Sequence, residues 1–220
     1  KMVLSHVING ETYLESGKTV TSVDDGAIKA EQNIGLMAQG IKNKIVTGIT
    51  WKEADYEIEN YGTIDFSAAK RSTAIYSESA RAKNDGTIKV WENSTGIYGI
   101  YKDDTRKFDG SGPGAKNKLE ITTTTNSKIN LGNNSTGMYL VNAQKLDNLG
   151  GEIKSTTGAT KNVGIYALNG ATSDAAYNKN ENYNILTMNN KANITLGDGS
   201  VGIFSRGKGI APAERNTVTN

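Results

Sequence analysis

The chain has 220 residues, of which 36% are hydrophobic and 7% are aromatic, and its formal net charge is +2. It contains no cysteine, which excludes disulfides, thiolate nucleophiles and cysteine-based zinc sites. No basic run suggests a nucleic-acid surface, and no apolar run approaches the ~20 residues of a membrane-spanning helix. Glycine is abundant and proline is rare, which favours many short strands joined by polar turns. Because the chain begins at Lys1 without a signal peptide, we expect it to be an internal segment of a longer protein.

A four-residue pattern recurs along the chain: a small or β-branched residue, glycine (once alanine), an aliphatic residue and a large apolar residue. Its six copies are Ile34–Met37, Thr73–Tyr76, Thr95–Tyr98, Thr136–Tyr139, Val163–Tyr166 and Val201–Phe204. A short segment of alternating character precedes each copy. These segments are centred on Ile28, Ile64, Ile88, Ile129, Ile153 and Ile194. Both patterns have the period of β-strands.

The spacing of the central isoleucines predicts the architecture. The intervals between successive ones are 36, 24, 41, 24 and 41, so a short and a long interval alternate from Ile64 onwards. The intervals from Ile64 to Ile129, from Ile88 to Ile153 and from Ile129 to Ile194 are therefore equal. At roughly 3.3 Å per residue, a coil of about 24 residues can travel round a closed cross-section and return one strand spacing, ~4.8 Å, further along. Parallel strands then stack from coil to coil and bury a common core, whereas an antiparallel sandwich would show hairpin signals without this register.

We therefore predict an all-β fold, a right-handed parallel β-helix of about six 24-residue coils between residues 24 and 206. Alternate coils carry insertions of about 17 residues, and residues 1–23 and 207–220 form flanking coils or edges of this single segment. A third strand per coil is expected at Tyr56–Glu59, Lys118–Thr123 and Ile185–Met188. Corners such as Asn60–Gly62 and Asn84–Gly86 are expected to use positive φ.

Alternation with a period of two assigns side chains to faces. In the strands around the central isoleucines, the predicted interior residues are Ile64, Phe66, Ile88, Val90, Ile129, Leu131, Ile194 and Leu196. In the recurring strand, Thr95, Ile97 and Gly99 are predicted to face inwards, and Gly96 and Tyr98 outwards. The outward column of large side chains forms a ladder of Met37, Tyr76, Tyr98, Tyr139, Tyr166 and Phe204.

The ladder has two interpretations. The rings could form a binding platform for sugars or for a partner protein, or they could only stack on each other and cover the glycine-rich strands. A slip of one residue in the register would instead bury the aromatic side chains.

The insertions fall at residues 38–55, 102–117 and 169–183, at the same point of their coils. We expect them to project from one face, where loops of repeat proteins often bind ligands. The candidate binding residues in them are Trp51, Asp103, Asp104, Arg106, Phe108, Asp174 and Tyr177. Alternatively, these loops only cap the sheet.

The sequence does not favour catalysis. The acidic pairs Asp24–Asp25 and Asp103–Asp104 lie in turns, and the single histidine, His6, precedes the repeats. Gly197–Ser200 is interpreted as a coil corner rather than as part of a protease or calcium motif. Two glycosylation-like triplets, Asn93–Thr95 and Asn134–Thr136, are also interpreted as corners. We expect no enzyme activity, no cofactor and no metal.

Residues Gly86–Val90 followed by Ser94–Tyr98 resemble the passenger repeats of large fusobacterial autotransporter adhesins. The resemblance extends over residues 24 to 206. It implies type V secretion, anchoring through an outer-membrane barrel outside this segment, and display at the bacterial cell surface. It also implies virulence-related adhesion to a receptor or glycan on host or bacterial cells. We expect the segment to be a monomer and, from its charge pattern, to bind no nucleic acid. A non-binding stalk is the alternative, and a polysaccharide-processing β-helix enzyme is a weaker one.

Overall fold

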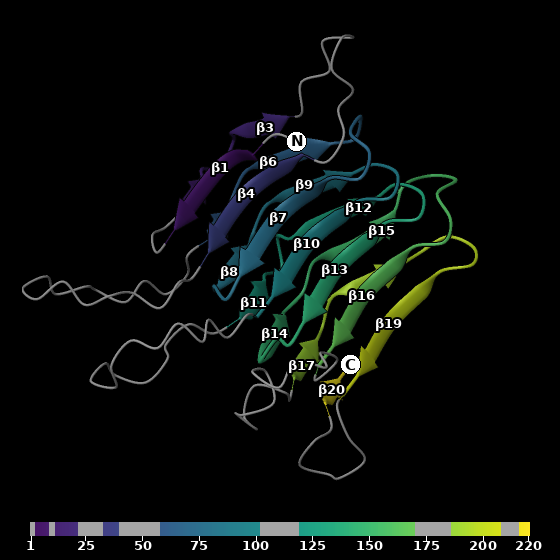
Figure 1. The fold of residues 1–220 in the computed structure, drawn as a ribbon. Coiled ribbons are helices and arrows are strands. Elements are labelled where there is room, and N and C mark those ends of the chain that lie inside the picture. Colours follow the sequence, from purple (N-terminus) through teal and green to yellow (C-terminus); the bar gives the residue numbers. More distant parts are fainter. Residues whose placement is uncertain are drawn as a thin grey trace, which may run out of the picture.

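The computed structural model describes residues 3–8, 12–21, 33–39, 58–101, 119–169, 186–207 and 216–220. All the strands among them belong to three parallel sheets (Figure 1). Sheet A contains β1 (Val3–Ile8), β4 (Ile34–Gln39), β7 (Thr73–Glu78), β10 (Thr95–Ile100), β13 (Thr136–Val141), β16 (Val163–Leu168) and β19 (Val201–Arg206). Sheet B contains β2 (Thr12–Leu14), β5 (Ile58–Asn60), β8 (Ala82–Asn84), β11 (Glu120–Thr123), β14 (Lys145–Asn148), β17 (Thr187–Asn190) and β20 (Thr217–Thr219). Sheet C contains β3 (Thr19–Thr21), β6 (Thr63–Phe66), β9 (Thr87–Val90), β12 (Lys128–Leu131), β15 (Glu152–Ser155) and β18 (Asn193–Thr195).

The chain visits sheets A, B and C in turn and then returns to sheet A one strand further along (Figure 1). In sheet C, Ile88 pairs with Ile64 on one side and with Ile129 on the other, across one short and one long interval of the repeat. Ile153 continues the column and pairs with Ile129 and Ile194, again across one short and one long interval. The predicted parallel β-helix, its third strand and its alternating coil lengths are therefore confirmed.

The N-terminal end differs from the prediction. The neighbour of Ile64 on that side is Val20 of β3, and not Ile28, which lies outside the described residues. Strand β1 pairs with β4 and places His6 opposite Met37. The described strands therefore form one more rung than the repeat pattern predicts, because the first rung is built from residues that do not follow it.

The core is a set of columns of fully buried side chains. Ile64, Phe66, Ile88, Ile129 and Leu131 have relative exposures of 0%. The equivalent Ile194 and Leu196 are only partly buried, because β18 is the last described strand of sheet C and no further described rung covers it. Burial in this fold therefore depends on the rung above. Among the described residues, no helix has the length and hydrophobicity needed to cross a bilayer.

The glycines of sheet A have a different role from the one predicted. Thr95 is half-buried on the outer side and Gly96 is buried, so the alternation is interrupted at the glycine. A Cβ atom on Gly96 would lie 2.6 Å from the carbonyl oxygen of Gly137 and 2.9 Å from Cγ2 of Ile129. Glycine is thus required here because the backbone of the next rung approaches closely, and not because the ring of Tyr98 covers it. Only Ala74 in β7 replaces it in the recurring pattern.

The corners between sheets B and C also differ from the prediction. Asn60 and Asn84 are buried, and neither they nor Gly62 and Gly86 are among the described residues with positive φ. A Cβ atom on Gly86 would lie 2.1 Å from the carbonyl oxygen of Gly62, so close packing of rungs explains this glycine. The two glycosylation-like triplets do form corners, because Asn93 and Asn134 have φ of 55° and 51°.

Two hydrogen-bonded ladders connect the rungs at these corners. In the asparagine ladder, Nδ2 of Asn60 donates to Oδ1 of Asn84 at 2.6 Å, and Nδ2 of Asn148 donates to Oδ1 of Asn190 at 2.5 Å. Thr123 occupies the rung below Asn148 and donates its hydroxyl to Oδ1 of that residue. Because these side chains are almost fully buried, each depends on its neighbours for hydrogen bonds.

The serine ladder lies at the corner that precedes sheet A. The backbone N–H of each member donates to the side-chain oxygen of the next, at 2.8–3.1 Å, from rung to rung. Its members are Asn33, Ser72, Ser94, Ser135, Asn162 and Ser200. The serines of the glycosylation-like triplets are therefore buried structural residues.

Candidate functional site

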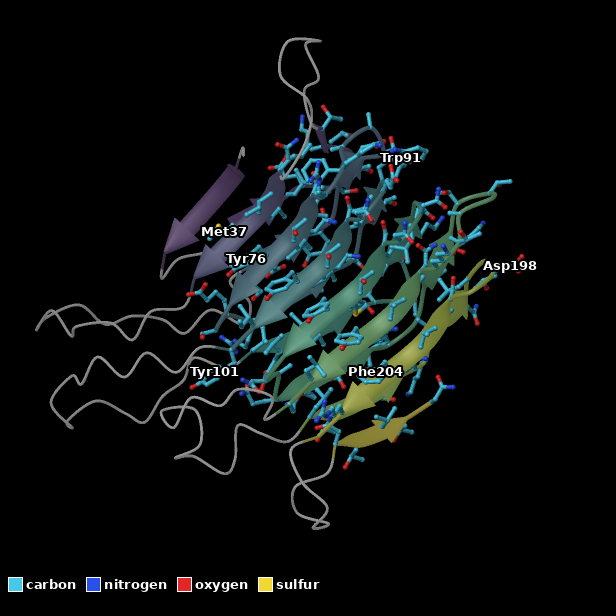
Figure 2. The ribbon with its side chains drawn as sticks, turned by 45° about the vertical axis from the view of Figure 1, so that its right-hand side comes forward. Met37, Tyr76, Trp91, Tyr101, Asp198 and Phe204 are labelled. Atoms are coloured by element: carbon cyan, nitrogen blue, oxygen red, sulfur yellow. The ribbon has the colours of Figure 1, made fainter. Side chains whose placement is uncertain are left out.

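The outer surface of sheet A is the candidate site. Its outward side chains form three columns along the stack, which we call the ladder face. The columns are Thr73, Thr95, Thr136, Val163 and Val201; Tyr76, Tyr98, Tyr139, Tyr166 and Phe204; and Glu78, Ile100, Val141, Leu168 and Arg206. Figure 2 shows Met37, Tyr76 and Phe204 along this face, and Met37 of β4, which pairs with Tyr76, continues the second column by one rung.

The predicted aromatic ladder is present. The rings of Tyr76, Tyr98, Tyr139, Tyr166 and Phe204 stack in sequence, with centroid separations of 5.4, 5.3, 4.9 and 4.7 Å. Interplanar angles lie between 7° and 23°. The separations follow the strand spacing, ~4.8 Å, because the parallel register places equivalent residues directly beside each other.

Two tyrosines of the ladder have raised pKa values. The hydroxyl of Tyr76 donates to Oε2 of Glu78 at 2.9 Å. Burial raises the pKa of Tyr76, and this hydrogen bond to a carboxylate raises it further. Burial is also the main cause of the raised pKa of Tyr139, with smaller contributions from its neighbours Tyr166 and Tyr98.

The stacking limits how the ladder can bind a ligand. Tyr98, Tyr139 and Tyr166 each have an aromatic ring on both sides, so no ring in the middle of the ladder has a free face. Sugars bind aromatic residues by lying flat on such a face. The half-buried rings are therefore better suited to contact with a flat protein surface.

Charge distinguishes the ladder face from the other two faces. Strands β10, β13 and β16 contain no charged residue. The outward side chains of sheets B and C carry both signs, and two pairs form salt bridges, Lys89–Asp65 at 2.8 Å and Lys145–Asp147 at 2.6 Å. Charged residues on those faces are Glu59, Lys83, Glu120, Lys145 and Asp147 in sheet B and Asp65, Lys89, Lys128, Glu152 and Lys154 in sheet C.

The described residues contain no cluster of side chains that could hold a metal ion. Within the described ranges, no three His, Cys, Asp or Glu side chains gather as metal ligands would. Gly197–Ser200 forms a corner, in which Gly199 has φ of 66° and the hydroxyl oxygen of Ser200 accepts a hydrogen bond from the N–H of Asn162 at 2.8 Å. This serine therefore belongs to the serine ladder.

The predicted loop residues lie outside the described part of the chain. These are Trp51, Asp103, Asp104, Arg106, Phe108, Asp174 and Tyr177, together with Asp24 and Asp25. The strands that precede the three predicted insertions, β4, β10 and β16, all belong to sheet A, and the strands that follow, β5, β11 and β17, all belong to sheet B. The roles of these residues stay predictions.

The third column of the ladder face was not among the residues predicted from the sequence. Ile100, Val141 and Leu168 lie two residues after an aromatic residue and are half-buried on the outer side. Alternation continued past the aromatic residue would have identified them. The residues that flank these three in the register, Glu78 and Arg206, carry opposite charges, and beyond Glu78 the register continues to Gln39 of β4.

Comparisons with models of known protein families, with curated proteins and with solved structures found no match. The geometry of the chain itself is therefore the basis for its functional interpretation.

Proposed function

We propose that this chain is a segment of a surface-displayed bacterial adhesin and that its ladder face binds a partner protein on another surface. The supporting observation is the uncharged surface of β10, β13 and β16 in a protein with 22% charged residues. Soluble proteins rarely expose a contiguous apolar surface unless it contacts something. The other two faces carry the mixed charges that keep a surface solvated.

Several features suit secretion through an outer membrane and display outside the cell. The chain has no cysteine, so export in an unfolded state would not be complicated by disulfide formation. Each rung contacts mainly its neighbours, so the fold can grow rung by rung as the chain emerges. The resemblance to autotransporter passenger repeats also supports this route, from which we infer display at the bacterial cell surface.

A second candidate function is that of a stalk that holds a binding region elsewhere in the parent protein. The asparagine and serine ladders favour it, because they link successive rungs by buried hydrogen bonds along the stack. Such a stack is stiff, and stiffness serves a spacer as well as a binding platform.

Adhesion of coated beads separates the two candidates. Beads carrying the chain would be tested on host cells, on bacterial cells and on beads coated with the same chain. Val141→Lys places a charge on β13, the middle one of the three uncharged strands, and Asn130→Lys places one on sheet C in the same coil. We expect the first change to weaken binding by about tenfold or more, and the second to leave it unchanged.

Both variants should keep the denaturation midpoint of the original chain, since both sites are half-buried on outer faces. Equal loss of adhesion in both variants would contradict the role of the ladder face. Absence of binding to all the surfaces would favour the stalk.

A further inference from the structure

Trp91 carries a large exposed side chain that the fold does not need. It follows β9 at the corner between sheets C and A and is 41% exposed, and Figure 2 shows it at the edge where the strands of sheet A begin. The register, continued by one residue, places Ser67 beside it on the preceding rung and Gly132 on the following one. The backbone carbonyl of Trp91 accepts a hydrogen bond from the hydroxyl of Ser135, a contact that any residue provides. The same corner thus forms with much smaller residues, and the indole is not required for it.

The indole of Trp91 differs from the tyrosine rings of the ladder face because no other ring stacks on it. Within the described residues, it has no aromatic contact, and its Nε1–H donates no hydrogen bond. Its neighbours in the register cannot stack on it, since Ser67 is short and Gly132 has no side chain. Tyr139, by contrast, has a ring on each side, at 5.3 and 4.9 Å. The exposed surface of Trp91 is therefore open to a flat ligand, whereas that of the ladder rings is not.

Polar groups surround Trp91, and they indicate what kind of ligand fits. A single exposed apolar residue is common on protein surfaces and would indicate little by itself. Nζ of Lys70 lies 2.6 Å from Oε2 of Glu92, the residue after Trp91, so a donor and an acceptor are present without net charge. Oδ1 of Asn133 accepts a hydrogen bond from the N–H of Thr160 at 2.9 Å, which orients the amide, while its Nδ2 has no partner in the described part of the chain. The exposed residues of this corner on the three rungs are Ser67, Lys70, Trp91, Asn93, Asn133 and Asn134.

We propose that the Trp91 corner, formed by Trp91, Lys70, Glu92 and Asn133, binds a neutral oligosaccharide with one pyranose ring flat on the indole. A pyranose has C–H groups on its faces and hydroxyls around its edge. The C–H face packs on the electron-rich face of the indole. The hydroxyls exchange hydrogen bonds with the Lys70–Glu92 pair and with Nδ2 of Asn133. This site lies at a corner, outside the three columns of the ladder face, and does not depend on the function proposed for that face.

Other ligands of aromatic side chains fit this corner less well. Quaternary ammonium groups are bound by several rings that enclose them, and Trp91 is the single ring at the described corner. Single-stranded nucleic acid requires a basic groove with a series of rings, whereas Lys70 is already paired with Glu92. A protein partner requires an apolar centre with a polar rim, and here polar residues lie directly beside the ring. An uncharged sugar matches the ring and the polar groups together.

The expected affinity of one corner is low. One ring face and a few exposed hydrogen bonds leave little free energy after the cost of association, so we expect a dissociation constant of about 1 mM. Weak single sites are sufficient where many copies of a protein face a surface covered with glycans, because the copies bind together.

Sugar titrations followed by NMR test the site on the chain in solution. The probes are lactose, cellotriose, chitotriose, mannotriose and the acidic sialyllactose. The chain has two tryptophans, and the indole N–H signal that is absent from Trp91→Phe belongs to Trp91. We expect at least one neutral probe to shift this signal and to saturate it with a dissociation constant of about 1 mM.

Variants locate the binding energy. Trp91→Ala should weaken binding of that probe by about tenfold or more, and Trp91→Phe by only a few-fold, because a smaller ring still presents a face. Leu149→Ala, which removes another exposed apolar side chain at a corner (40% exposed), is the matched control and should change nothing. All three variants should keep the denaturation midpoint, since the sites are exposed.

The results separate this site from the ladder face. A Trp91 signal that no probe shifts at about ten times the expected dissociation constant would overturn the sugar site. Equal losses in Trp91→Ala and Leu149→Ala would also overturn it, and tighter binding of sialyllactose than of lactose would overturn the choice of a neutral sugar. If no sugar binds but Val141→Lys abolishes bead adhesion, the adhesin proposal stands and the sugar site fails. If Trp91→Ala abolishes sugar binding while Val141→Lys leaves adhesion unchanged, the sugar site stands and the role of the ladder face fails.

Discussion

Buried asparagine side chains at the corners between sheets B and C form hydrogen bonds from one rung to the next. They show how much the fold depends on single polar residues. Asn148 accepts a hydrogen bond from Thr123 and donates one to Asn190, and it is 1% exposed. An unpaired buried polar group costs about 1–3 kcal/mol. A ladder of this kind therefore stabilises only the register in which every member has its neighbours.

We expect Asn148→Ala to lower the free energy of unfolding by about 2–4 kcal/mol, because it leaves both Thr123 and Asn190 short of a partner. Asn148→Thr should cost less, since the ladder already accommodates a threonine at position 123. Asn130→Ala, on the outer side of the same coil, is the control and should stay within about 0.5 kcal/mol. Urea denaturation followed by circular dichroism measures all three, and equal losses for Asn148→Ala and Asn130→Ala would contradict the role of the ladder.

The residues of these corners could be predicted from the sequence, but the predicted role, a turn at positive φ, was wrong. An Asn-x-Gly corner is equally compatible with a turn at positive φ and with an asparagine that points inwards. The distinction depends on which atoms of the neighbouring rung lie beside the corner. For Gly86, the carbonyl oxygen of Gly62 in the preceding rung lies where a side chain would start. Contacts between residues a whole coil apart are not visible in the local pattern that defines a turn.

At the scale of an element, the tyrosines of sheet A act as a unit. The raised pKa values of Tyr76 and Tyr139 result mainly from burial within the ladder. The folded protein therefore keeps these phenol protons at a pH where the unfolded chain releases them, which is above about 10 for an ordinary tyrosine. The resulting stability is complete below that pH and is lost as the pH rises towards the folded-state pKa.

We expect the free energy of unfolding to fall as the pH is raised from 9 to about 11, a window that begins near the ordinary tyrosine pKa. In the double variant Tyr76→Phe, Tyr139→Phe this decline should be smaller, because phenylalanine has no phenol proton that the unfolded chain could release. Denaturation at a series of pH values measures the slope. A slope unchanged in the double variant would show that these tyrosines do not contribute to it.

The existence of the ladder followed from the sequence because an aromatic residue recurs at equivalent places of successive coils. The outward direction of Thr95 did not follow, because strict alternation assumes a regular strand. In sheet A the buried Gly96 breaks the alternation, so Thr95 and Tyr98 are both on the outer side. The close packing of rungs at the glycine thus reverses the predicted facing of Thr95 and Gly96, while the rest of the strand follows the prediction.

The whole molecule is a stack in which each rung is covered by its neighbours. The repeat spacing predicted this because Ile64, Ile88, Ile129, Ile153 and Ile194 belong to one column. It could not predict the first rung, where Val20 takes the place of an isoleucine in the column beside Ile64. A residue belongs to a column because of its neighbours in space. The sequence around Val20, a single valine between two threonines, is too common a pattern to indicate that Val20 lies beside Ile64.

Duplication of residues 65–88 should give a longer molecule that still folds. The insertion adds one complete coil, as Ile64 and Ile88 occupy neighbouring rungs. We expect the denaturant dependence of unfolding to increase, since more surface is buried. Duplication of residues 65–76, half a coil, is the control and should disrupt folding. Circular dichroism and urea denaturation distinguish the two, and equal behaviour would contradict the coil period.

The hydrogen bonds between rungs have a mechanical consequence. They run from strand to strand along the axis of the molecule, so a force that pulls its two ends apart loads them one rung at a time. The outermost strand would peel away while the rest of the stack stays intact. A released short coil adds roughly 80 Å of extended chain where it had occupied ~4.8 Å. Under tension, such a molecule would lengthen in large steps and absorb the pull at its end.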